Sequence, residues 1–61
     1  MTLAWFRVGP GRFHLAETWE DAEDGYGCTS IVKHGDVWSR TESADGSTRT
    51  ASSWSALMEA R

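Results

Sequence analysis

The chain has 61 residues and a net charge of −3 at pH 7, with six Lys and Arg residues against nine Asp and Glu residues. A chain of this length forms one domain and buries only about 60% of the surface that its unfolded form exposes, which leaves no room for both a large core and a deep pocket. We therefore expect that the protein is not an enzyme. A single Cys excludes an internal disulfide, and no group of Cys and His residues has the spacing of a zinc site, so we predict no metal and no cofactor.

The N-terminal segment has neither the basic opening nor the apolar stretch of roughly 7–15 residues that marks a secretory signal. The longest apolar run is far shorter than the roughly 20 residues that cross a bilayer. We expect a cytoplasmic protein with no membrane contact, and the free thiol of Cys28 is compatible with that compartment.

Residues 3–8 and 12–19 predict two strands of a β-hairpin, because runs of aromatic and aliphatic residues flank a turn at Gly9-Pro10-Gly11. With Pro10 and Gly11 as the central turn residues, one side of the hairpin carries these facing pairs: Val8 with Phe13, Phe6 with Leu15, and Ala4 with Glu17. We predict that this side faces the core. The other side then carries Leu3, Trp5, Arg7, Arg12, His14 and Ala16.

Residues 20–27 predict an exposed acidic loop, because residues 17–24 hold five of the nine acids and show no strand alternation. One helical turn over residues 20–24 is an alternative. The carboxylates would steer a basic partner and the aromatic side chains would anchor it. The resulting candidate partner-binding residues are Glu17, Trp19, Glu20, Asp21, Glu23, Asp24 and Tyr26. The simpler interpretation is a solvated loop that keeps the protein soluble.

A second hairpin is predicted from residues 28–33 and 37–42, around His34-Gly35-Asp36, where Gly-Asp suits a type II′ turn. One face would carry Cys28, Ser30, Val32, Val37, Ser39 and Thr41, and the other Ile31, Lys33, Trp38, Arg40 and Glu42. The periodicity does not decide which face is buried. Cys28 and His34 share a side, but about 20 Å of strand separates them, which is too far for proton transfer.

The C-terminal part predicts a turn at residues 44–47, a short strand at residues 48–50 and an amphipathic helix over residues 53–60. Ser52 or Ser53 would cap this helix. Trp54, with Leu57 and Met58, would be a core residue, docking over Phe6, Val8, Phe13 and Leu15. We predict an α+β fold, a small antiparallel β-meander of three to five strands with one C-terminal helix packed on the sheet. A small SH3-like barrel with a terminal helix is the alternative.

These features favour a binding module, an adaptor, regulator or inhibitor, that recognises a protein partner through exposed Trp residues and the acidic loop. The alternative is nucleic-acid binding by cations and stacking rings on the sheet, which places the site at Trp5, Arg7, Arg12, His14, Lys33, Trp38 and Arg40. An isoelectric point near 5.1 disfavours nucleic acid. A homodimer in which Trp5 or Trp38 meets its counterpart is a third hypothesis.

Overall fold

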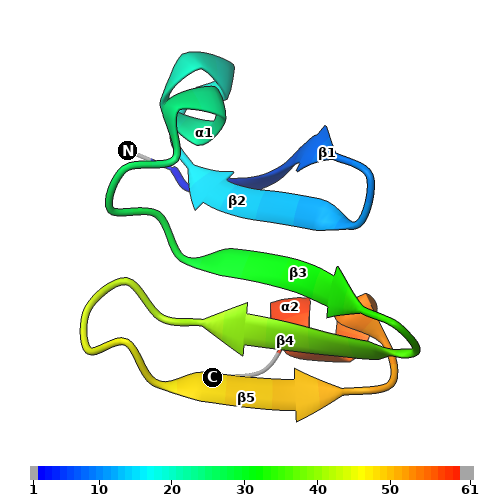
Figure 1. Ribbon diagram of the computed structural model, residues 1–61. Coiled ribbons are helices and arrows are strands. Elements are labelled where there is room, and N and C mark those ends of the chain that lie inside the picture. Colours follow the sequence, from blue (N-terminus) through cyan, green and yellow to red (C-terminus); the bar gives the residue numbers. More distant parts are fainter. Residues whose placement is uncertain (1, 60–61) are drawn as a thin grey trace.

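The fold is an open antiparallel sheet of five strands in the order β1-β2-β3-β4-β5, as shown by a computed structural model that describes residues 2–59 (Figure 1). The strands are β1 (Ala4–Gly9), β2 (Arg12–Ala16), β3 (Ser30–His34), β4 (Val37–Thr41) and β5 (Thr48–Ala51). Two short helices complete it, α1 (Trp19–Asp24) and α2 (Trp54–Glu59). The predicted meander with a C-terminal helix is confirmed, and the sheet is not closed into a barrel.

The segment predicted as an acidic loop contains α1. Its N-terminus is capped by Thr18, whose Oγ1 accepts a hydrogen bond from the Asp21 backbone N–H at 3.2 Å. Glu20 and Asp21 lie in the first turn, where negative charge interacts favourably with the helix dipole. Because Thr18 caps the helix, β2 ends at Ala16 instead of continuing to residue 19. The small Ala22 side chain is fully buried and lets the helix approach β2 closely.

The predicted register of the first hairpin is wrong beyond its turn. Gly9 faces Arg12 as expected, but Arg7 faces Phe13, so Val8 is an extra residue that makes a β-bulge in β1. Pro10 followed by Gly11 with a φ of 66° is the pattern of a type II turn, whose twist does not match that of the flanking strands. A bulge adds right-handed twist and takes up this mismatch. The pairs beyond it are Phe6 with His14, Trp5 with Leu15 and Ala4 with Ala16.

The shifted register places Phe6 and Phe13 on opposite faces of the sheet, so the single core face predicted for both is wrong. Phe6 meets Trp19 of α1 edge-on, with ring centroids 6.2 Å apart. Phe13 stacks on Trp54 of α2, with centroids 5.3 Å apart. Each face is thus covered by one helix, and we call them the α1 face and the α2 face. In Figure 1, α2 lies behind β4.

The second hairpin has the two faces predicted from its alternation. His34 faces Val37 across the turn, and Gly35 has a φ of 63° whereas Asp36 has no positive φ, as a type II′ turn requires. Ile31 is fully buried on the α2 face, which answers the question that periodicity left open.

The predicted C-terminal helix begins at Trp54, after Ser53, whose Oγ accepts from the Ser55 N–H at 3.3 Å. Residue 60, the predicted last residue of this helix, lies outside the described residues. Leu57 is 3% exposed and anchors α2 to the sheet, whereas Trp54 is 39% exposed and is not the core residue we predicted. Within residues 2–59, neither helix is long or apolar enough to cross a membrane.

Candidate functional site

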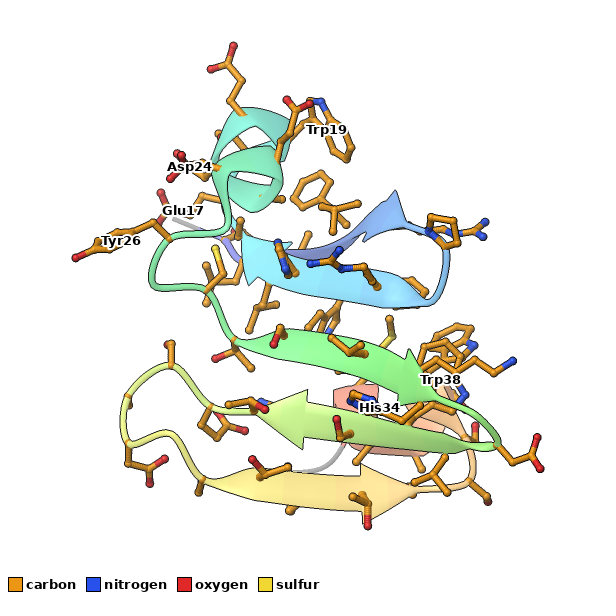
Figure 2. The ribbon with its side chains drawn as sticks, viewed as in Figure 1. Glu17, Trp19, Asp24, Tyr26, His34 and Trp38 are labelled. Carbon is orange, nitrogen blue, oxygen red and sulfur yellow. The ribbon has the colours of Figure 1, made fainter. Side chains whose placement is uncertain are left out.

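One candidate surface is the acidic tip, which comprises residues 17–27, that is α1 with the residues just before and after it. Its seven predicted partner-binding residues are all exposed. They are Glu17, Trp19, Glu20, Asp21, Glu23, Asp24 and Tyr26. In the view of Figure 2, Trp19 projects from one side of α1, while Glu17, Asp24 and Tyr26 project from the other. Because Trp19 also packs against Phe6 of the sheet, Tyr26 is the aromatic side chain most available to a partner.

Tyr26 is held outward by a hydrogen-bonded loop. It is 92% exposed and lies between Gly25 and Gly27, which have φ values of 75° and 72°. The Gly25 N–H donates to the Asp21 carbonyl at 3.0 Å, and the Cys28 N–H donates to the Gly25 carbonyl at 3.3 Å. The Cys28 thiol is half-buried, 3.7 Å from the Asp21 carbonyl oxygen. The loop therefore presents the phenol ring from a fixed backbone.

His14 supports the acidic tip from below and is not part of the nucleic-acid face predicted for it. Its Nδ1 lies 2.7 Å from the carbonyl oxygen of Ala22, within hydrogen-bond distance. A Cβ placed on Gly25 would lie 2.9 Å from His14 Cε1, so the ring also packs tightly against the end of α1. Arg12 is exposed, and by alternation it lies with His14 on the α1 face.

A second candidate surface is a groove on the α2 face, at the end of the sheet that carries the β1–β2 and β3–β4 turns. Its volume is about 350 Å³, and its lining residues come from strands β1 to β4, from the β1–β2 turn and from α2. We call it the turn-end groove, and its lining residues are Arg7, Gly11, Phe13, Lys33, Trp38 and Trp54. Three of the residues predicted for nucleic-acid binding thus meet here. Phe13 and Trp54, which we predicted as core residues, also line the groove.

The geometry of the turn-end groove follows from strand pairing. Arg7 faces Phe13 across β1 and β2, and Lys33 faces Trp38 across β3 and β4. The Lys33 N–H donates to the Gly11 carbonyl at 2.8 Å, which ties the first turn to β3. The Lys33 ammonium lies 5.9 Å from the Trp38 ring centroid, and the ring centroids of Trp38 and Phe13 are 6.0 Å apart.

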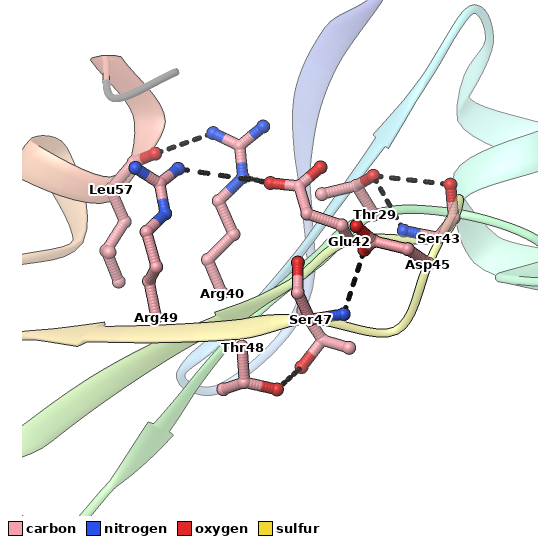
Figure 3. Close-up of polar contacts among 10 residues, drawn as sticks. Thr29, Arg40, Glu42, Ser43, Asp45, Ser47, Thr48, Arg49 and Leu57 are labelled. Carbon is pink, nitrogen blue, oxygen red and sulfur yellow. Dashed lines mark hydrogen bonds and ion pairs between the residues drawn. The ribbon is translucent and has the colours of Figure 1, made fainter.

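Trp5 and Arg40 lie on the α2 face but do not line the groove. The Arg40 guanidinium sits 5.5 Å from the Trp5 ring centroid, and its Nη1 donates to the Leu57 carbonyl at 2.7 Å. Its Nε lies 2.6 Å from Glu42 Oε2, and only 12% of its side chain is exposed (Figure 3). These contacts hold α2 on the sheet, and they involve the same guanidinium for which we predicted a phosphate contact.

The β4–β5 loop adds two acids to the end of the sheet that carries α1. Glu42 binds Arg40 and lies 3.9 Å from Arg49, while the Asp45 carboxylate accepts from the Ser47 N–H at 2.9 Å (Figure 3). That bond, together with the Ser47 hydroxyl, lowers the pKa of Asp45 below its ordinary value. Across residues 2–59, no three His, Cys, Asp or Glu side chains gather as a metal site would require.

Comparison of the chain with protein families, with curated proteins and with solved structures finds no match.

Proposed function

We propose that this protein is a non-catalytic binding module that recognises a basic protein partner through the acidic tip. The observation that carries the proposal is the Tyr26 side chain, 92% exposed at the apex of a hydrogen-bonded loop and next to a helix of exposed carboxylates. An exposed Tyr in that position adds nothing to the core. It suits an interface, because Tyr offers a large contact area and loses little conformational entropy on binding.

The charges of the acidic tip favour a cationic partner. Its five carboxylates lie within eight consecutive residues, and none of them forms an ion pair with another residue of the described chain. Their mutual repulsion is relieved when a cationic surface approaches, which raises the association rate and selects against acidic partners. Tyr26 and the exposed part of Trp19 would then supply the apolar anchors that most interfaces depend on.

The proposal is tested by capturing proteins from a lysate of the source cells on the immobilised full chain. The wild type is compared with Tyr26→Ala and with Val37→Ala. Val37→Ala is a matched control, because it also shortens an exposed side chain but lies in the β3–β4 hairpin, outside the acidic tip. We expect a protein of net positive charge to bind the wild type and Val37→Ala. Loss of the Tyr26 anchor should weaken its binding by roughly 30-fold, mainly through faster dissociation.

A charge variant distinguishes the effect of the carboxylates on the association rate from the effect of Tyr26 on the dissociation rate. Glu20→Gln combined with Glu23→Gln keeps the size of both side chains and removes two charges, so it should slow association at low salt and change dissociation little. Capture of the same proteins by Tyr26→Ala as by the wild type contradicts the proposal. Capture of this chain alone would instead support the homodimer.

A further inference from the structure

We propose that the turn-end groove binds one base and the two phosphates that flank it in a single-stranded nucleic acid. This site lies on a different part of the molecule from the acidic tip, so the inference goes beyond the proposed function. The groove combines two exposed cations, Arg7 and Lys33, with the rings of Phe13, Trp38 and Trp54. A nucleotide offers the matching pair of groups, a flat ring that stacks on aromatic side chains and a phosphate that binds cations.

The aromatic rings of the groove form a supported platform. Trp54 stacks on Phe13 with an angle of 27° between the rings, and Trp38 leans on the same Phe13 ring at 51°. Phe13 thereby fixes both Trp rings, one from α2 and one from β4. Trp54 is 39% exposed, so part of its surface is free to stack on a base without unpacking the core.

The two cations are available to a phosphate. Neither Arg7 nor Lys33 takes part in an ion pair with the described residues, and no acidic side chain lines the groove. Lys33 lies over the Trp38 ring, so it is already close to where a stacked base would carry its phosphate. The five carboxylates of the acidic tip are at the other end of β2, which reduces their repulsion of a phosphate here.

The size of the groove favours part of a chain over a whole free ligand. Its volume of about 350 Å³ is at the lower end of the range of about 300–1,000 Å³ for sites that enclose small molecules. It is also partly open to solvent, so it does not cover most of a ligand's surface. A strand of which only one nucleotide enters the groove fits such a partly open site.

The test is a titration of intrinsic Trp fluorescence with a 12-nucleotide oligothymidylate, repeated over a series of salt concentrations. Stacking quenches the Trp signal, and two phosphate contacts predict that log K falls with log salt with a slope of about −1.4. Arg7→Gln or Lys33→Gln should each reduce this slope to about −0.7. Arg12→Gln is the matched control, because it removes the same charge from the α1 face and should leave both affinity and slope unchanged.

Removing the stacking surface tests the aromatic part of the site. Trp38→Leu should weaken oligothymidylate binding by roughly 5- to 150-fold. The far-UV circular dichroism of each variant shows whether it is folded, and the exposed Arg7 and Lys33 variants keep the proposal testable if Trp38→Leu does not fold.

Three results would overturn the assignment. The first is no quenching of the wild type by oligothymidylate at low salt, and the second is an equal loss of affinity in Arg12→Gln and Arg7→Gln. The third is binding of thymidine monophosphate, or of a peptide of alternating Glu and Trp, as tightly as the oligonucleotide. Those two probes would point to a free nucleotide or to an acidic peptide as the occupant.

Discussion

At the scale of single residues, Gly25 joins the acidic tip to the sheet. It ends α1 with a φ of 75° and donates its N–H to Asp21, and the space beside its Cα is filled by the His14 ring. The Nδ1 atom of His14 in turn lies within hydrogen-bond distance of the Ala22 carbonyl oxygen. The orientation of α1 therefore depends on the His14 side chain, and so does the position of Tyr26. Any residue larger than Gly at position 25 would displace His14.

Gly25→Ala should lower the free energy of unfolding by about 1–3 kcal/mol, because a non-glycine residue is strained at positive φ and the new methyl group meets His14. Gly27→Ala is the matched control, since Gly27 has a similar φ of 72° and open space around it. Its cost should be the φ strain alone, about 1 kcal/mol. Urea denaturation of both variants measures the difference, and equal losses would show that the His14 contact does not constrain position 25.

Cations that look equivalent in the sequence have different roles in the structure. Arg40 is nearly buried between Trp5, Glu42 and the C-terminal end of α2, whereas Arg7 is exposed at the turn-end groove. The sequence alone could place both on one sheet face by alternation, but not assign these roles, because they depend on how α2 crosses the strands.

At the scale of elements, α2 is held by few contacts. Leu57 is its buried anchor, Trp54 stacks on Phe13, and Arg40 binds the Leu57 carbonyl. An isolated six-residue helix is not stable in water, so these contacts account for its presence.

Leu57→Ala should reduce the free energy of unfolding by about 2–5 kcal/mol, because it removes a buried side chain and leaves a cavity under α2. The Arg40 bond to the backbone carbonyl of residue 57 is retained, so the loss reports packing. Thermal unfolding followed by circular dichroism measures it. Val37→Ala, which trims an exposed side chain, should change stability by less than about 0.5 kcal/mol. A similar effect of the two substitutions would mean that α2 adds little stability.

The hairpins, the C-terminal helix and its cap could be predicted from the sequence, because turn residues and apolar spacing encode them locally. The bulge at Val8 could not, since apolar residues lie on both sides of the first strand and either register buries some of them. That one-residue shift moved Phe13 to the face of Arg7. The acidic tip was predictable because its residues are consecutive in the sequence. The turn-end groove was not, because it combines residues of four strands, one turn and α2 and depends on the bulge.

At the scale of the whole molecule, charge is divided between the two ends of the sheet. The end with α1 and the β4–β5 loop carries most of the acids, and the end with the turns carries Arg7, Arg12 and Lys33. The net charge of −3 is therefore unevenly distributed, and the two candidate surfaces have opposite signs. Because the acidic tip and the turn-end groove lie at opposite ends of the sheet, salt screens the charge of each surface from the ligand of the other.

The protein should be a monomer in solution, with a molar mass near 6.8 kDa by light scattering. The two edge strands discourage pairing between copies, because β1 is interrupted by its bulge and β5 has four residues, one of them Arg49. Trp5 and Trp38, the residues that a homodimer would use, each lie under a cation of the same chain. A mass near twice this value would favour the homodimer instead.

The order β1-β2-β3-β4-β5 also has a kinetic consequence, because every strand pairs with the strand that precedes it in the chain. No pairing waits for a distant segment, so the loop-closure entropy at each step is small. Chains with such local topology fold faster than β proteins whose partners are far apart in sequence. The sheet can therefore grow one strand pair at a time, each new pair adding to a neighbour in the sequence.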